Sequence, residues 1–314
     1  MHVIELKHPF DYQEEAMPAA QVLAIGDFDG VHLGHRAVIE RAIRTAKEQG
    51  LPVSIMTFHP HPREILGADK YRQILTPLPD KLELFRQMGV DNTILVAFDR
   101  SFSDLSPLEF VRDILLKLNL RAVVVGFDFT FGSGGSGTAP ELGGLSAGQF
   151  AVHVVEPYCQ EGSKVSSTLI REAIQEGRLD DANGLLGRYY SVSGEVVEGE
   201  GRGRKMNYPT ANIGMSLPYV VPKNGVYAVK VKLRGQTYGG VMNIGVKPTF
   251  TGDGIRTLEA HIFDFADSIY GETVAVEFVR MLREERKFPS VNELIAQITA
   301  DADAARGLFA QNKE

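Results

Sequence analysis

A short apolar run that ends in glycine and leads into two histidines constrains the fold of this chain more than any other segment. Residues 22–25 are all apolar and are followed by Gly26, as in a strand that is buried on both faces of a parallel sheet. From Gly34 onward, apolar residues recur at helical spacing with charged residues on the opposite face, and Gly50 ends the pattern. The segment therefore predicts a strand, a tight turn and the start of a helix.

Two histidines, His32 and His35, stand one turn apart where this helix is predicted to begin. Free backbone N–H groups and the positive end of the helix dipole favour an anion there. The imidazoles can donate hydrogen bonds to a phosphate whose charge grows in a transition state, and Gly34 lets the phosphate approach the backbone. Surface histidines on a capped helix are the alternative, because four-residue patterns recur by chance. The preceding strand and glycine-rich turn favour the phosphate site.

The composition describes an ordinary globular chain whose length favours two domains. The 314 residues are 44% hydrophobic and 23% charged, and they exceed what one core usually serves. The net charge of −7 argues against a general nucleic-acid binder. Cys159 is the single cysteine, the first residues lack a signal-peptide pattern, and no apolar run is long enough to span a bilayer. We therefore expect a cytoplasmic protein without membrane or nucleic-acid partners.

Strands and helices alternate through the first half of the chain. The strand predicted over residues 52–58 runs into His-Pro-His-Pro at residues 59–62, and a strand over residues 121–126 leads to Asp128. This alternation predicts a doubly wound parallel sheet, whose ligands bind at the carboxyl ends of the strands. We interpret the His-Pro segment as a stiff loop at that edge, because neither a cysteine cluster nor an H-E-x-x-H pattern indicates a metal site. Asp128 is placed for a ligand hydroxyl or amine.

Two later segments of this half also indicate ligand binding. Residues 132–138 are rich in glycine and serine, which by composition alone is typical of a flexible linker. Because they lie inside the alternating pattern, we interpret them as a mobile active-site loop. Residues 166–168 place three hydroxyl groups at the start of a predicted helix, with Arg171 one turn further on. The hydroxyls either only cap the helix or converge with the guanidinium on one triphosphate.

The pattern changes near Asn183, where we place the boundary between two domains, residues 1–183 and 184–314. Beyond it come short strands at close spacing and one helix over residues 291–308, which predicts a closed antiparallel β-barrel with a C-terminal helix. The strands are predicted over residues 190–197, 226–233, 236–242, 258–263 and 273–279.

The first loop of this barrel is a second candidate for phosphate binding. Residues 199–205 alternate glycine with basic residues, as in a flexible hairpin tip or in a flap whose N–H groups hold phosphates. Thr210 and Asn212 are two apart on an extended segment and face the same way, so a hydroxyl and an amide oxygen can share one magnesium ion. Glu259 faces away from the apolar residues of its strand, and by this pattern alone it is an ordinary outward glutamate.

These motifs resemble, in the same order along nearly the whole chain, those of bacterial bifunctional riboflavin kinase/FAD synthetases, within the H-x-G-H nucleotidyltransferase superfamily. The similarity is carried by residues 26–35, 58–66, 126–132, 165–171, 209–212 and 259–265. It implies a Rossmann-like H-x-G-H domain that transfers an adenylyl group from ATP to FMN, giving FAD and pyrophosphate, and a barrel that phosphorylates riboflavin to FMN. It also implies Mg²⁺ as the cofactor and ATP as the co-substrate of both steps.

The resemblance further implies which residues do this chemistry. For adenylyl transfer it assigns catalysis to His32, His35 and Arg171, ATP binding to Gly26, Phe28, Gly30, Gly34, Ser166, Ser167 and Thr168, and flavin binding to Phe58, Pro60, Asp128 and Phe129. For the kinase it assigns the base to Glu259, the metal to Thr210 and Asn212, ATP binding to Gly199, Gly201, Gly203, Arg204, Lys205 and Pro209, and flavin binding to Arg283 and Phe288.

Three positions depart from the family pattern. Many members have asparagine where Asp27 stands and arginine where Thr130 and Leu169 stand. Both nucleotide signatures remain intact, but these departures leave the details of phosphate contact open.

Two other functions compete with this interpretation. One is an H-x-G-H transferase for another substrate, such as a pantetheine or nicotinamide nucleotide, which would leave the second domain unexplained. The other is a flavin-binding regulator that has lost turnover, and the intact motif residues count against it. The sequence predicts no particular oligomeric state.

Overall fold

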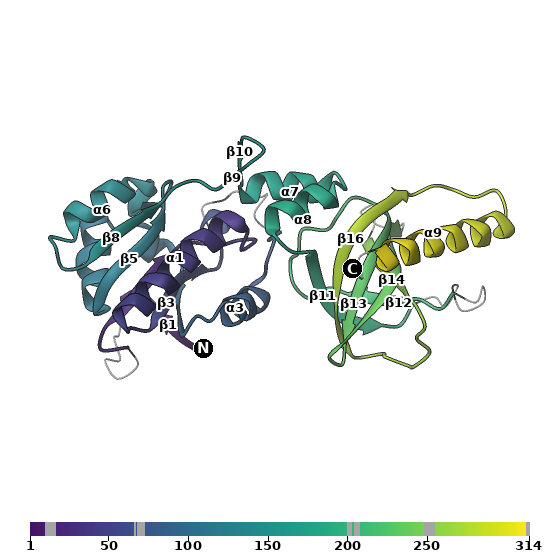
Figure 1. Cartoon of the computed structure of the whole chain (residues 1–314), viewed down its shortest axis with the longest axis horizontal. Helices are drawn as coiled ribbons and strands as arrows, with labels where there is room; N and C mark the ends of the chain where they lie inside the picture. The colour runs from purple at the N-terminus through teal and green to yellow at the C-terminus, as the bar shows by residue number, and fades with distance from the viewer. Residues whose placement is uncertain are drawn as a thin grey trace. The chain divides into compact units, whose positions relative to one another are not determined.

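Two compact units make up the chain, Met1–Ser167 and Thr168–Glu314 (Figure 1). The computed structural model describes residues 1–9, 17–65, 67, 73–199, 203, 208–247 and 255–311. The first unit is built around a parallel sheet and the second around a barrel. Within these described ranges, no helix combines the length and apolar character that a membrane span requires.

A six-stranded sheet forms the centre of the first unit. The strand order is β1-β4-β3-β2-β5-β8, and every neighbouring pair is parallel. The apolar run at residues 22–25 lies in the inner strand β2, with β3 and β5 on its two sides. The strands are β1 (His2–Leu6), β2 (Gln21–Ile25), β3 (Val53–His59), β4 (Asn92–Ala97), β5 (Leu120–Gly126) and β8 (Ala151–Val155).

Helices cover both faces of this sheet, because successive residues of a buried strand face opposite sides. Val22 and Leu23 of β2 are both fully buried. Val22 belongs to an apolar cluster with α1 (Leu33–Gln49) and α3 (Leu78–Gln87), whereas Leu23 belongs to a second cluster that includes α6 (Ala139–Leu145). This burial on two sides confirms the predicted doubly wound fold.

The other elements of the first unit are short. The glycine-rich stretch at residues 132–138 lies in a hairpin of β6 and β7, and therefore inside the unit rather than at its end. These elements are α2 (Pro62–Ile65), α4 (Arg100–Ser103), α5 (Pro107–Glu109), η3 (Phe110–Ile114), η4 (Leu115–Lys117), β6 (Thr130–Phe131), η5 (Ser133–Gly135), β7 (Gly137–Thr138), β9 (Cys159–Gln160) and β10 (Ser163–Lys164).

A closed barrel with strand order β11-β12-β15-β14-β13-β16 forms the centre of the second unit, and all its pairings are antiparallel. This confirms the predicted barrel, although the sequence interpretation did not identify β12 as a strand and ended β14 too early. The strands are β11 (Tyr190–Val197), β12 (Ala211–Gly214), β13 (Gly225–Leu233), β14 (Gln236–Lys247), β15 (Ile255–Ile262) and β16 (Thr273–Glu284).

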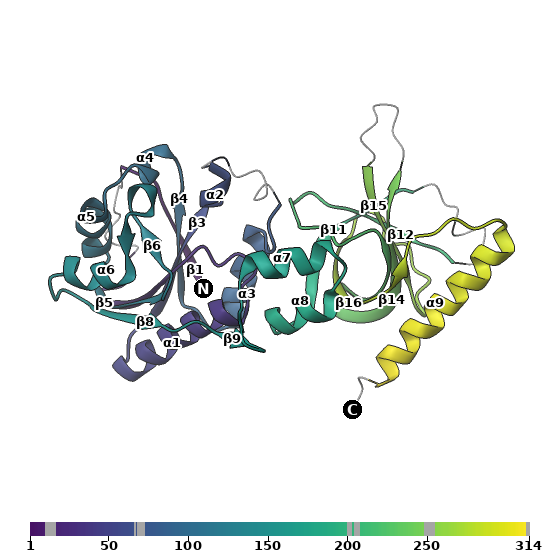
Figure 2. The ribbon, with the colours of Figure 1, turned by 90° about the horizontal axis from the view of Figure 1, so that it is seen from above.

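The C-terminal helix α9 (Val291–Gln311) runs along the outside of the barrel (Figure 2). Ala302 and Ala305 of this helix pack in an apolar cluster with Ala228 of β13 and Val241 of β14. Small residues at this contact let the helix lie close to the strands. The outer face of β13 and β14 is therefore covered by α9.

Two further helices, α7 (Ser167–Gln175) and α8 (Leu179–Leu186), precede the barrel. The amide of Asn183 in α8 donates hydrogen bonds to the carbonyls of Phe278 at 2.9 Å and Val279 at 3.2 Å. Its side-chain oxygen accepts a hydrogen bond of 2.7 Å from the N–H of Tyr190. Asn183 is thus hydrogen-bonded to two strands of the barrel, β11 and β16. The domain boundary that the sequence places near Asn183 stays a prediction.

Candidate functional site

The turn between β2 and α1 bends sharply. Phe28, Gly30 and Val31 have positive φ angles of 56°, 92° and 39°, which are uncommon for residues other than glycine. The side chains of Phe28 and Val31 are buried, so their packing holds the backbone in this conformation. Such strain clusters at ligand sites, and phosphate binding at this turn stays a prediction.

Asp29 links this turn to two other segments by hydrogen bonds. The sequence interpretation did not identify Asp29. The side chain is buried, and its Oδ1 accepts hydrogen bonds from the N–H groups of Leu75 at 2.9 Å and Thr76 at 3.0 Å. Its backbone carbonyl accepts a hydrogen bond of 2.8 Å from the hydroxyl of Ser167. Asp29 therefore fixes the turn to the chain before α3 and to the first residue of α7.

The two histidines meet at the start of α1. His32 caps the helix, because its Nδ1 accepts a hydrogen bond of 3.2 Å from the N–H of His35. A ring nitrogen that accepts carries no proton, so a neutral His32 ring has its proton on Nε2. The two rings stack with their centroids 3.6 Å apart and their planes 19° apart. Both imidazoles thus lie together at the helix N-terminus, where the sequence places the phosphate site.

The predicted hydroxyl cluster lies at the start of α7. Ser166 and Ser167 are half-buried and Thr168 is exposed. Arg171 is only 4% exposed, which is unusual for arginine because burying a guanidinium requires hydrogen-bonding partners. Ser167 is the last residue of the first unit, and Thr168 and Arg171 belong to the second.

An aromatic cluster lies near the carboxyl end of β3, where flavin binding is predicted. The ring of Phe58 is 5.9 Å from that of Phe98 and 5.7 Å from that of Phe102, measured between centroids. Phe58, Phe98 and the nearby Pro60 are half-buried, so part of each stays accessible. An apolar surface of this kind suits the flat ring of a flavin.

Asp128 and Phe129 follow the end of β5. The exposed carboxylate of Asp128 lies 2.6 Å from Nζ of Lys164, and this ammonium also lies 4.5 Å from the ring centroid of Phe127. The half-buried ring of Phe129 stacks on Phe131 at 5.7 Å. Asp128 is therefore already paired with a cation at the edge where the sequence predicts a ligand.

In the barrel, Glu259 of β15 is paired with Asn212 of β12 on one side and with Asn243 of β14 on the other. Paired residues of neighbouring strands have their side chains on the same face. Ala260 and Met242, the next residues of two of these strands, are buried, so the three polar side chains form a row on the outer face. The sequence interpretation did not select Asn243, although the alternation of polar and apolar residues along its strand places it outward.

Two glycines of the preceding loop touch the predicted metal ligands. A Cβ atom on Gly199 would lie 2.0 Å from the amide nitrogen of Asn212, and one on Gly203 would lie 3.3 Å from the hydroxyl of Thr210 and 2.2 Å from the carbonyl of Tyr208. Only glycine allows this close approach of the loop backbone. The other predicted residues of the loop, Gly201, Arg204 and Lys205, lie outside the described residues.

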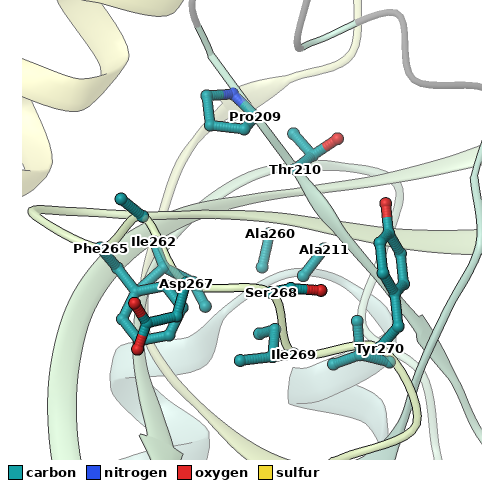
Figure 3. A pocket seen from close by; sticks show the side chains of 12 residues that line it. Pro209, Thr210, Ala211, Ala260, Ile262, Phe265, Asp267, Ser268, Ile269 and Tyr270 are labelled. Carbon is teal, nitrogen blue, oxygen red and sulfur yellow. The ribbon is translucent and has the colours of Figure 1, made fainter.

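A cavity of about 250 Å³ lies beside the same segment (Figure 3). Figure 3 shows Pro209 and Thr210 across the cavity from Ile269. Most of the lining is apolar, and Ile262 and Phe265 contribute to it. The backbone here is held by His261, whose Nδ1 donates a hydrogen bond of 2.8 Å to the carbonyl of Pro209, because a carbonyl can only accept.

The predicted flavin-binding residues of the barrel also contact one another. The guanidinium of Arg283 lies 5.6 Å from the ring centroid of Phe288. Its Nε and Nη2 donate hydrogen bonds of 3.0 and 2.8 Å to the carboxylate of Asp301 in α9. Asp301 is 6% exposed and accepts a further bond of 2.8 Å from Gln297. The sequence interpretation did not identify Asp301, which fixes the position of Arg283.

Two family models match separate parts of the chain. The model for FAD synthetase matches residues 14–169, and the model for riboflavin kinase matches residues 186–309. The first range contains the stacked histidines, and the second contains the outer-face row and the cavity.

Curated relatives match nearly the whole chain. A protein of Bacillus subtilis strain 168 named bifunctional riboflavin kinase/FMN adenylyltransferase is 41% identical over 312 residues, with 98% of each chain covered. A protein of the same name from Escherichia coli K12 is 40% identical over 297 residues, with 93% of this chain and 94% of the relative covered.

A solved structure shares the fold over the same length. The crystal structure of a protein from Streptococcus pneumoniae, named macrolide-efflux protein, has a TM-score of 0.89 and 34% identity, covering 98% of this chain and 99% of the other. That name refers to macrolide efflux, whereas the family models and the curated relatives refer to flavin enzymes. With two enzyme models over most of its length and full-length relatives that are 40% and 41% identical, this chain belongs to the family of bifunctional riboflavin kinase/FMN adenylyltransferases.

Proposed function

We propose that this chain makes FAD from riboflavin in two steps that each consume ATP. The barrel phosphorylates riboflavin to FMN, and the first domain transfers the adenylyl group of a second ATP to FMN. The observation that carries the proposal is the presence of two separately built candidate phosphate sites in one chain. One is the stacked pair of His32 and His35 at the start of α1, and the other is Glu259 beside Asn212 and the glycine loop.

In the kinase step, Glu259 takes the proton of the ribityl 5′-hydroxyl of riboflavin. The hydroxyl oxygen attacks the γ-phosphorus of ATP, the bond from this phosphorus to the bridging oxygen breaks, and FMN and ADP form. Thr210 and Asn212 offer a hydroxyl and an amide oxygen, and such hard oxygen donors fit Mg²⁺. When bound, Mg²⁺ neutralises charge on the phosphates.

The cavity next to Thr210 supports a place for the adenine ring of this ATP. Its apolar lining, which includes Phe265 and Ile269, suits a flat aromatic ring. Thr210 borders both the cavity and the glycine loop, because Gly203 packs against its hydroxyl. One nucleotide could therefore place its base in the cavity and its phosphates beside Thr210 and Gly203.

In the second step, a phosphate oxygen of FMN attacks the α-phosphorus of ATP. The bond from this phosphorus to the β-phosphate oxygen breaks, and pyrophosphate leaves. His32 and His35 donate hydrogen bonds to the phosphates, which become more charged in the transition state, and Arg171 with the hydroxyls of residues 166–168 binds the triphosphate. Phe58, Pro60, Asp128 and Phe129 are proposed to hold the flavin. No covalent intermediate is required, because positioning and charge stabilisation drive this chemistry.

The direct test is a time course with riboflavin, ATP and Mg²⁺ in which the flavins are separated by chromatography. FMN should appear before FAD. The paired variants Glu259→Gln and His35→Asn should each remove one activity, the first blocking FMN formation and the second blocking FAD formation from supplied FMN. FMN as the only product would restrict the activity to the barrel, and flavin binding without turnover would indicate the regulator instead.

The domain boundary near Asn183 and a cytoplasmic location also stay predictions. Limited proteolysis followed by mass spectrometry tests the boundary, because cleavage near residue 183 would yield fragments that match residues 1–183 and 184–314. Cleavage near residue 167 would instead match the boundary between the two compact units. The presence of the protein in the cytosolic fraction of its cells tests the location.

A further inference from the structure

Asp27 brings a carboxylate into the phosphate turn, one residue after Gly26. Its Oδ2 accepts a hydrogen bond of 2.8 Å from Nε2 of His61, and its Oδ1 lies 3.9 Å from Nζ of Lys81. The same ammonium donates a hydrogen bond of 2.7 Å to the backbone carbonyl of Asp27, which also accepts one of 2.9 Å from the hydroxyl of Thr57. Both the main chain and the side chain of Asp27 are therefore held.

The residues that hold Asp27 are more buried than Asp27 itself. The side chains of His61 and Lys81 are 7% and 6% exposed, whereas that of Asp27 is 26% exposed. Buried side chains of this kind have few alternative positions. His61 and Lys81 therefore form a rigid support, and the carboxylate lies against it at the edge of the turn.

The orientation of His61 is set by a second hydrogen bond. Its Nδ1 accepts from the N–H of Arg63 at 3.1 Å, so the proton of the neutral ring lies on Nε2, which faces Asp27. His61 follows Pro60 directly in the loop where flavin binding is proposed. The contact between His61 and Asp27 thus connects the proposed flavin loop with the phosphate turn.

Asp27 carries a negative charge close to a site that must accept polyphosphate. Burial acts to raise the pKa of Asp27, but the charge of Lys81 and the hydrogen bond from His61 outweigh it and hold the pKa well below its usual range. A charged His35 ring would also lower the pKa of this carboxylate, which lies within electrostatic reach of that ring. A carboxylate free to turn toward the triphosphate would repel it.

We propose that His61 and Lys81 are positioning residues of the adenylyl-transfer site, which hold the Asp27 carboxylate away from the ATP phosphates. The triphosphate then meets the N–H groups of α1 and the histidines without facing a free carboxylate. This inference rests on the proposed adenylyl transfer. It assigns a role to three residues that the proposed mechanism does not use, and it explains how a carboxylate is tolerated in a phosphate-binding turn.

The test begins with His61→Phe, which keeps a buried ring and removes the hydrogen-bond donor. The KM for ATP in FAD formation from FMN should rise about tenfold, the effect of roughly 1.4 kcal/mol from one nearby charge, while kcat changes less. The KM for ATP in FMN formation, measured on the same full-length preparation, should stay unchanged. Lys81→Met is a second probe, which removes the cation 3.9 Å from Oδ1 of Asp27 together with the hydrogen bond that Lys81 donates to the Asp27 carbonyl. Because Asp27→Asn can reverse only the effect of the charge, a partial rescue is expected for this variant.

The decisive step combines each of these variants with Asp27→Asn. If the released charge causes the rise in KM, removing that charge should restore the KM to within about threefold of the wild-type value. A purely structural role predicts no rescue, because Asp27→Asn restores no packing. If His61→Phe does not fold, the comparison of Lys81→Met with the double variant Lys81→Met/Asp27→Asn decides. Absence of a rise, or a rise that Asp27→Asn does not reverse, overturns the inference, whereas absence of FAD formation by the wild-type chain overturns the proposed function.

Discussion

Glu259 and Asn212 lie directly opposite each other in the register of β15 and β12, with both side chains on the outer face of the barrel. Opposite residues on one face have Cβ atoms about 5 Å apart, so the backbone alone keeps a carboxylate beside an amide. Asn212 is in turn in contact with Gly199 of the glycine loop. Asn212, a proposed metal ligand, therefore lies between the proposed base Glu259 and the proposed phosphate loop.

The substitution Glu259→Gln should separate the two activities. Glutamine keeps the shape of the side chain but cannot accept the proton of the ribityl hydroxyl, so FMN formation should fall at least about 100-fold. FAD formation from supplied FMN should stay within about twofold, as chromatography of the flavins would measure. The control is Glu195→Gln, which changes an exposed glutamate of β11. Equal loss of both activities in Glu259→Gln would contradict two separate sites.

The substitution Asn212→Ala should weaken the use of magnesium in the kinase step alone. It removes one oxygen donor, so the Mg²⁺ concentration needed for half-maximal FMN formation should rise about tenfold. A magnesium titration at saturating ATP measures this, with FAD formation from FMN as the internal reference. Asn243→Ala is the matched control, because Asn243 lies on the other side of Glu259 in the same row. A similar rise in both variants would argue against Asn212 as the ligand.

Most of the fold could be predicted from the sequence, because the strong patterns are local. The apolar run of β2 is buried on both faces, and a run with that property indicates an inner parallel strand. The strand β12 was not recognised because only one of its four residues, Ile213, is buried. A strand with a single inward apolar residue shows no alternation that a pattern could detect.

Less of the site could be predicted, because its contacts join distant segments. The histidine pair was found, since His32 and His35 interact within one helical turn. The bonds from Asp29 to Leu75 and Thr76 depend on how the chain returns to the turn, and no spacing in the sequence encodes that return. A sequence motif therefore indicates the residues within it, but not the contacts with distant segments that hold the motif in place.

The substitution Asp301→Asn should loosen both α9 and the proposed flavin site of the barrel. It leaves the half-buried guanidinium of Arg283 without its carboxylate, which should lower the free energy of unfolding by about 3 kcal/mol. Arg283 should also lose its fixed position beside Phe288, so the KM for riboflavin should rise several-fold. Urea unfolding of the full chain and kinase kinetics measure the two effects.

The control for this experiment is Arg306→Gln, which breaks another ion pair of α9, with Asp264 in the segment that follows β15. Arg306 and Asp264 are 2.9 Å apart, but both are exposed, so their loss should lower the free energy of unfolding by at most about 1 kcal/mol. The KM for riboflavin should stay unchanged in Arg306→Gln. If the KM for riboflavin rises equally in Asp301→Asn and Arg306→Gln, Asp301 has no specific role in positioning Arg283, and α9 only packs against the barrel.

The ion pairs of Asp27 predict how acid affects stability. Since Lys81 and His61 outweigh burial and hold the folded-state pKa below the usual 3.8, the charged carboxylate contributes stability above that pH and loses it as the pH falls. Asp27→Asn lacks this contribution at every pH. The difference in unfolding free energy between wild type and Asp27→Asn should therefore be largest near pH 7 and shrink below about pH 4. Urea unfolding at a series of pH values measures this difference.

The control is Glu83→Gln. Its difference in unfolding free energy from wild type should be small at every pH, because Glu83 and its partner Arg86 are exposed and water screens their charges. A difference for Asp27→Asn that is the same at pH 7 and pH 3 would contradict the role of charge.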